Sequence, residues 1–112
     1  GTIYCFNTIT ALGEISGASF NATSDYRIKN NVKDLNATYT VDNLRPKIYT
    51  NSLLEKTDIG LIAHELQEHY PFLVNGIKDG DPKQSVNYTG LIGILIKEIQ
   101  ELKKRVLLLE EK

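Results

Sequence analysis

Apolar residues recur with alternating steps of three and four along the C-terminal part of the chain, from residue 89 onward. If Ile92 takes heptad position a, the a and d positions are filled by Ile92, Leu95, Ile99, Leu102, Val106 and Leu109. This spacing predicts a long helix over residues 88–112 with a coiled-coil seam. β-Branched residues at position a with leucine at position d, taken alone, favour a coiled coil of two helices.

Charged residues beside the seam predict that the associating helices run parallel. Glu98 at position g would face Lys103 at the following position e of a neighbouring helix. Arg105 and Glu110 would form a second pair of the same kind. Such pairs contribute only about 0.3–0.5 kcal/mol each, so they select the orientation of the helices more than they stabilise them.

Further apolar residues widen the hydrophobic face of this helix. Leu91 and Ile96 fill the first g and e positions, and Ile94 and Leu107 lie outside the seam. A wide face suits three helices, or a helix that also packs on its own globular body. The periodicity leaves both open, together with an amphipathic helix buried inside a monomer. The apolar run 106–109 favours self-association, because so small a monomer could hardly bury it.

Residues 28 to 88 alternate short apolar stretches with turn residues, which predicts a small mixed core of class α+β. Pro46 and Pro71 are expected to end the helices that precede them. Asn75-Gly76 and the residues 79–82 are typical of a hairpin or a polar protrusion. The expected helices are 28–35 and 64–70, with one short helical turn at 41–44, and the expected strands are 47–50 and 58–63. The segments 72–74 and 85–88 bracket the expected hairpin or protrusion.

Residues 1–23 alternate apolar and polar side chains and are rich in Gly, Thr and Ser, which predicts extended structure. With few large apolar groups, this segment must pair with the rest of the domain or with copies of itself. We expect it to be the end of a β-rich fibre that precedes a domain at 24–112. The first residues lack the pattern of a signal peptide, and we expect the chain to be a piece of a longer protein.

Composition excludes several classes of function. A net charge of −1 from mixed signs argues against nucleic acid or an anionic membrane as partner, and no apolar run could span a bilayer. The single cysteine, Cys5, cannot form an internal disulfide and is expected to be a small packed side chain. We expect no cofactor.

Ser24 lies between the polar N-terminal segment and the domain, with Lys29 five residues later. One interpretation is a helix N-cap, because Ser and Thr are common in that position. The other is a nucleophile that attacks the adjacent backbone carbonyl, for which a serine needs a base. A lysine amine can serve where desolvation or a nearby cation, such as Arg27, lowers its affinity for the proton. Residues five apart meet only across a turn or between chains, so the spacing permits a Ser–Lys dyad without requiring it.

His64 and His69 flank Glu65 in a stretch that superficially resembles a zinc motif. Zinc peptidases place their histidines four apart on one helical face, and here they are five apart. We expect no metal site. His64 and Glu65 are instead expected to supply a buried hydrogen bond or a contact near Ser24. Gly90 and Gly93, at the start of the long helix, are expected to permit close packing.

Four motifs occur in order: residues 24–31 (SDYRIKNN), 60–66 (GLIAHEL), 70–74 (YPFLV), and 86–88 (VNY) leading into a helix with KEIQEL at 97–102. Together they resemble the C-terminal intramolecular chaperone domain of viral tail spikes and fibres. The best-known member is the endosialidase-type domain, a self-cleaving unit classed as a serine peptidase. A related domain occurs in the eukaryotic myelin regulatory factor.

The resemblance implies a domain that trimerises at the end of a fibre, aligns three chains while the upstream β-structure folds, and then cuts itself off. The implied scissile bond is Thr23–Ser24, with Ser24 as nucleophile and Lys29 as base. Asp25, Arg27 and Asn31 would be supporting residues. His64 stands where glutamine is more usual in the family. The implied location is a virion fibre or spike precursor assembled in the host cytoplasm, with the chaperone released after cleavage.

Two alternatives remain at this stage. The domain could be a structural trimerisation cap of a fibre that does not cleave itself. A relative of the transcription factor would require a membrane span and a DNA-binding region upstream, and neither is present in these residues.

Overall fold

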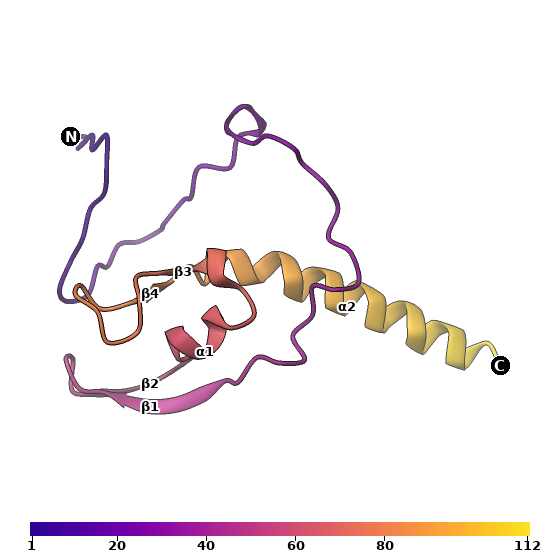
Figure 1. The fold of residues 1–112 in the computed structure, drawn as a ribbon. Helices are drawn as coiled ribbons and strands as arrows, with labels where there is room; N and C mark the ends of the chain where they lie inside the picture. Colours follow the sequence, from indigo (N-terminus) through magenta and orange to yellow (C-terminus); the bar gives the residue numbers. More distant parts are fainter.

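The computed structural model describes all residues from Gly1 to Lys112. It is a small α+β fold with a long C-terminal helix that extends beyond the body (Figure 1). The elements in chain order are η1 (Tyr26–Ile28), β1 (Lys47–Asn51), β2 (Lys56–Gly60), α1 (Ala63–Gln67), η2 (Pro71–Leu73), β3 (Val74–Asn75), β4 (Ser85–Val86) and α2 (Thr89–Glu110), where η marks a 3-10 turn. No helix combines the length and apolar content that crossing a membrane requires.

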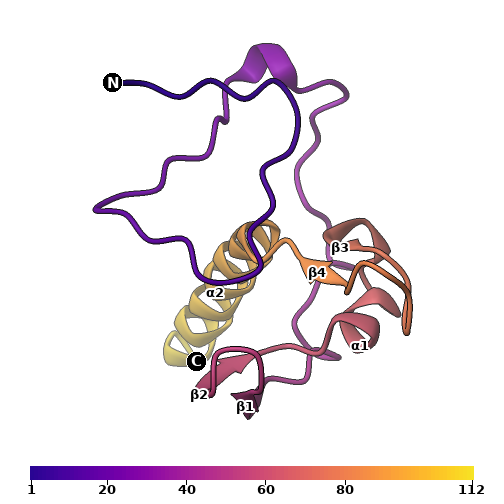
Figure 2. The ribbon, with the colours of Figure 1, turned by 90° about the vertical axis from the view of Figure 1, so that its left-hand side faces the viewer.

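The N-terminal segment, residues 1–23, forms no strand. All of its side chains are exposed, and it makes a wide excursion around the body before it reaches η1 (Figure 2). Its one ion pair with the body joins Glu14 to Lys56 at the end of the β1–β2 hairpin. The first alternative, pairing with the rest of the domain, is therefore wrong. Pairing with copies of itself from other chains stays a prediction.

The predicted helix over 28–35 is also wrong. The chain makes only the three-residue turn η1, after which Lys29 is extended with φ −122° and ψ 127°. Asn31 then has a φ of 54°, in the left-handed region. An isolated short helix is unstable without tertiary packing, and Ile28 and Val32 remain exposed with nothing to pack against.

Strands β1 and β2 form an antiparallel hairpin in which Lys47 pairs with Gly60 and Asn51 pairs with Lys56. The side chain of Asn51 accepts hydrogen bonds from two backbone amides of the turn. The first predicted strand is confirmed. The second lies two residues earlier than its predicted start and ends at Gly60, because the Tyr88 hydroxyl binds both the N–H and the C=O of Leu61.

Helix α1 is shorter than the predicted 64–70, and Pro71 begins the turn η2 after it. The predicted pairing of the segments around 72–74 and 85–88 is confirmed as the small hairpin β3–β4, with Val74 opposite Val86. Residues 76–84 form the polar protrusion between these strands. The predicted turn at 41–44 is confirmed and is closed by a hydrogen bond from Leu44 N–H to Val41 C=O.

The core is small and lies where α1, η2 and β3 meet the first half of α2 (Figure 1). Its buried apolar residues are Leu66, Tyr70, Leu73, Val74, Leu91 and Ile94. Gly90 allows this contact, because a Cβ there would overlap Leu73 Cδ2. At Gly93 a Cβ would make only an ordinary contact of 3.8 Å with Leu35, so the prediction of close packing holds for Gly90 alone.

Helix α2 confirms the predicted long helix and divides its apolar residues between two faces. Leu91 and Ile94, at heptad positions g and c, are buried against the body of the same chain. The a and d residues of the predicted seam are each 46–68% exposed: Ile92, Leu95, Ile99, Leu102, Val106 and Leu109. The helix therefore packs on its own body and still leaves the seam open.

Candidate functional site

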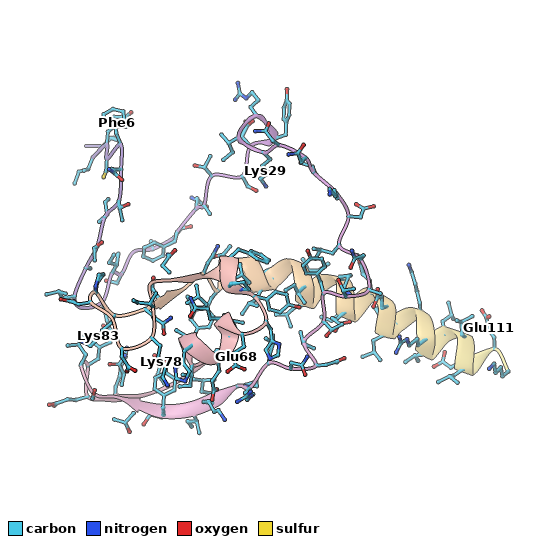
Figure 3. All side chains as sticks on the ribbon, in the orientation of Figure 1. Phe6, Lys29, Glu68, Lys78, Lys83 and Glu111 are labelled. Atoms are coloured by element: carbon cyan, nitrogen blue, oxygen red, sulfur yellow. The ribbon has the colours of Figure 1, made fainter.

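The turn η1 brings together the two residues that the sequence leaves five positions apart. Ile28 N–H donates to Asp25 C=O at 3.2 Å, and Lys29 N–H donates to Tyr26 C=O at 3.1 Å. This tight turn reverses the chain between Ser24 and Lys29. The Nζ atom of Lys29 donates a hydrogen bond of 2.5 Å to Ser24 Oγ. We term residues 24–34 the arm, in which every residue except Asp25 is exposed. Figure 3 shows Lys29 at the far end of the arm from the body, beside the turn.

Asp25, and not Ser24, caps the turn. Its carboxylate accepts a 2.8 Å hydrogen bond from Arg27 N–H. The same carboxylate binds the Arg27 guanidinium at two points, both 2.9 Å. The N-cap interpretation of Ser24 is therefore wrong, since the capping role belongs to the next residue. The Ser24 hydroxyl is left to contact Lys29.

The pairing of Asp25 with Arg27 sets the electrostatics of the turn. Hydrogen bonds from the Arg27 side chain, and then from its backbone N–H, hold the pKa of the Asp25 carboxyl below its ordinary value of 3.8. The same contact raises the pKa of Arg27. The guanidinium charge is thus matched by a carboxylate at contact distance. Arg27 shapes the turn in this structure and is not a free cation beside the amine of Lys29.

The remaining predicted residues fall at two places. Asn31 follows Lys29 by two residues and has a left-handed backbone. His64 and Glu65 lie on α1, and both views of the ribbon show α1 apart from η1 (Figures 1 and 2). In the single chain these two residues are therefore not brought to Ser24, and the predicted contact with the junction is not made within one chain.

Glu65 has its own local environment. Its Oε2 atom accepts a 3.4 Å hydrogen bond from Arg45 Nη1, and its Oε1 atom is buried without a partner. No group of three or more His, Cys, Asp or Glu side chains is arranged as metal ligands would be. Glu65 therefore joins α1 to the chain that precedes β1.

Sequence analysis missed two charged residues of α2 that hold the chain just after the dyad. Lys97 Nζ donates to Asn36 C=O at 3.2 Å, and Glu98 Oε1 accepts from Val41 N–H at 2.9 Å. The heptad pattern assigns both side chains to the helix surface. No local signal identifies them, because the backbone groups that they bind lie about 60 residues earlier in the chain.

Ser24 and Lys29 form an open site in the single chain. Both side chains are exposed, and Asp25 is half-buried. The geometry supplies a hydroxyl nucleophile with an amine in contact, next to the Thr23–Ser24 bond. A hydroxyl in contact with an amine is the arrangement that a serine nucleophile with a lysine base requires.

Comparison with curated proteins found no match. Comparison with family models matched residues 24–75 to a peptidase family described as chaperone of endosialidase. The matched segment begins at Ser24 and runs through η1, both strands of the first hairpin, and α1, as far as β3. This match supports the intramolecular chaperone domain that the sequence motifs indicate.

Proposed function

We propose that this protein is the folding and trimerisation chaperone at the end of a viral fibre or spike, and that it releases itself by cutting the Thr23–Ser24 bond. The observation that carries the cleavage is the 2.5 Å hydrogen bond between Lys29 Nζ and Ser24 Oγ. The family match supports the chaperone role. Residues 1–23 would remain as the end of the mature fibre.

The reaction begins when Ser24 Oγ adds to the carbonyl carbon of Thr23 and its proton passes to Lys29 Nζ. Collapse of the tetrahedral intermediate breaks the C–N bond and transfers a proton to the leaving amide nitrogen, which leaves Thr23 as an ester on Ser24 Oγ. Water then hydrolyses the ester. The products are a Thr23 carboxylate and a Ser24 with a free amine, so no cofactor is required.

Assembly is what would activate the dyad. An amine accepts a proton only in its neutral form, and water favours the ammonium ion. Ser24 and Lys29 are both exposed in the single chain. We propose that neighbouring chains cover this arm in the trimer and exclude water from it. Cleavage would then report that three chains have assembled.

The open seam of α2 supplies the surface for that assembly. Six a and d side chains remain largely exposed, while the body already covers another face of the same helix. A coiled coil of three such helices would hold the chains at an effective concentration of about millimolar. This helps an intertwined β-fibre, whose non-local contacts form slowly. Cleavage afterwards removes the route back, so the stability of the fibre becomes kinetic.

Mass spectrometry of freshly expressed protein tests the cleavage. We expect a fragment that begins at Ser24 and a complementary fragment that ends at Thr23. Ser24→Ala and Lys29→Ala should each abolish both fragments. Lys33→Ala is the matched control, because Lys33 is an exposed lysine on the same arm, whereas the lysine bonded to Ser24 is Lys29. It should cleave like the wild type.

The exposure of the dyad also favours a second function, a trimerisation cap that does not cleave itself. Sedimentation and mass spectrometry of the same preparation distinguish the self-cleaving chaperone from the non-cleaving cap. A trimer whose chains all keep the intact mass, with or without Lys29, would establish the structural cap and exclude the peptidase.

A further inference from the structure

Residues 35–41, which we term the anchor segment, fix the exposed dyad arm to the body. Leu35 lies against α2 near Gly93. Asn36 C=O accepts from Lys97 Nζ, and Val41 N–H donates to Glu98 Oε1. Between these points the Tyr70 hydroxyl binds both the N–H and the C=O of Thr40. The segment has no regular secondary structure, so side chains hold it in place.

Lys97 is buried to an extent that is unusual for a lysine. Only 9% of its surface is exposed, although it lies on a helix that is mostly open to solvent. Its ammonium group also lies 3.6 Å from Glu101 and 3.9 Å from Glu98. A buried charge is costly unless it is paired and hydrogen-bonded. Here the carbonyl of Asn36 and the two carboxylates provide those partners.

Glu98 is engaged within its own chain. As a position g residue it was expected to meet Lys103 of a neighbouring helix, but its Oε1 atom instead binds Val41 N–H at 2.9 Å. An open groove between the anchor segment and α2 includes Val41, Glu98 and the seam residue Leu102 in its lining. The anchor segment therefore adjoins the surface on which a second helix would pack.

We propose that Lys97 and Glu98 are positioning residues for the self-cleavage. By clasping the anchor segment onto α2, they set how far the Ser24–Lys29 turn reaches from the coiled-coil seam. The inference rests on the proposed function. Seven positions separate Lys29 from Asn36 along the arm. Without the clasp, the first held residue is Thr40, or Lys47 in β1 if Thr40 also detaches.

A longer tether lowers the effective concentration of the dyad at the place where neighbouring chains would cover it. Effective concentration falls roughly as the −3/2 power of tether length. If the first held residue moves from Asn36 to Thr40 or Lys47, we expect cleavage to slow about two- to fourfold. The longer tether leaves the Lys29 amine, the Ser24 hydroxyl and the turn η1 unchanged. Cleavage would therefore slow only because the dyad is positioned less often where neighbouring chains cover it.

The experiment compares cleavage rates of the full chain, followed by mass spectrometry of the Ser24 fragment. Glu98→Ala and Lys97→Met remove the two clasp contacts, whereas Glu98→Gln keeps an oxygen that can accept from Val41 N–H. Lys103→Ala removes only the predicted partner of Glu98 in a neighbouring helix. Lys97→Met frees Asn36 and moves the first held residue to Thr40, so we expect this variant, alone or combined with Glu98→Ala, to slow cleavage about twofold. Glu98→Ala alone leaves Asn36 bound to Lys97 and should slow cleavage less. Glu98→Gln and Lys103→Ala should match the wild type.

A second measurement does not depend on cleavage. On the uncleaved Ser24→Ala chain, Glu98→Ala should speed hydrogen exchange at the Val41 amide, while sedimentation shows the same assembly. Unchanged hydrogen exchange at the Val41 amide would overturn the inference. Equal slowing of cleavage by Glu98→Ala, Glu98→Gln and Lys103→Ala would also overturn it, because that result would identify an ion pair between Glu98 and Lys103 of neighbouring chains. A wild type that yields no Ser24 fragment would instead overturn the proposed function, and the inference with it.

Discussion

Two tyrosine hydroxyls hold irregular backbone in place of a sheet or a helix. Tyr70 binds the N–H of Thr40 at 3.0 Å and its C=O at 2.8 Å. Tyr88 binds the N–H of Leu61 at 2.9 Å and its C=O at 3.3 Å. Each hydroxyl thus satisfies two backbone groups that have no partner in a ladder. This is how so small a core orders the segments between its elements.

Replacing these tyrosines with phenylalanine should therefore destabilise the fold unequally. Tyr70→Phe should cost about 1–3 kcal/mol, because Tyr70 is buried and leaves the backbone groups of Thr40 unpaired. Tyr88→Phe should cost less, because Tyr88 is half-exposed and water can replace its hydroxyl. Urea unfolding measures both, with the exposed Tyr26→Phe as a control expected within about 0.5 kcal/mol of wild type. Equal losses at Tyr70 and Tyr88 would contradict this account.

The turn that carries the dyad should respond to acid through Asp25. The pKa of this carboxyl in the folded chain lies below its ordinary value of 3.8. Its contribution to the stability of the turn is therefore fully present above the pKa of the unfolded chain, and it is lost as the pH falls through the pKa of the folded chain. We expect the Arg27 amide resonance to titrate with a midpoint below 3.8 as the cap is lost. Asp25→Asn, which can cap without a charge, should remove that titration. A midpoint at or above 3.8 would refute the pairing.

At the scale of elements, α2 performs two tasks with different faces. Its first half contacts the body through Leu91 and Ile94, and its seam runs beside that contact toward the free end. The close approach at Gly90 allows the first task, because Leu73 occupies the space where a Cβ would be. Heptad periodicity describes the seam alone, since the contact with the body depends on where the rest of the chain folds.

The two glycines of α2 provide a matched test of this packing. Alanine at either position gains helix propensity of up to about 1 kcal/mol. At Gly90 that gain is opposed by the contact with buried Leu73, and overpacking costs about 1–3 kcal/mol. We expect Gly93→Ala to stabilise the fold and Gly90→Ala to destabilise it relative to Gly93→Ala, as measured by chemical denaturation. Equal stabilities of the two variants would show that Leu73 moves aside freely.

At the scale of the whole molecule, a small buried core is combined with an extensive apolar surface. The seam residues are largely exposed, and so are many apolar residues of the N-terminal segment, among them Phe6 and Leu12. Exposed apolar surface of this extent marks an interaction site. The single chain is therefore best understood as one part of the assembly that we propose.

A charge placed in the seam tests the assembly without touching the core. Ile99 is 56% exposed in the single chain, so Ile99→Lys should leave the body folded. In a trimer, three such lysines would meet at a buried layer, and the proposed assembly should dissociate at micromolar concentration. Sedimentation measures the oligomer and circular dichroism the helix.

The matched control for the seam is Gln100→Lys, which adds the same charge at the neighbouring, exposed position b. It should preserve the trimer. If Ile99→Lys and the wild type sediment alike, the seam is not the interface. Loss of the Ser24 fragment in Ile99→Lys, but not in Gln100→Lys, would further link cleavage to assembly.

Sequence patterns predicted the elements that depend on neighbouring residues. The long helix, the strand at 47–50 and the hairpin around residues 76–84 were all indicated by local periodicity and turn residues, and the structure contains them. The helix predicted at 28–35 does not form, because Ile28 and Val32 have nothing to pack against and only Leu35 reaches α2. Residues 1–23 do not pair with the rest of the domain, and their pairing with copies of themselves in an assembly stays a prediction.

The order of residues was enough to indicate a seam on α2, because a heptad is a property of nearby positions. It permitted a pairing of Ser24 with Lys29 without requiring it, and the likeness of the motif at 24–31 to a known family favoured that pairing. Only the tertiary structure decided that Asp25 caps the turn, that Ser24 is thereby free to contact Lys29, and that the body covers the face of α2 beside the seam. The hydrogen bonds from Lys97 and Glu98 to the anchor segment are also features that only the tertiary structure decided. Their partners are distant along the chain, so only the folded arrangement brings them together.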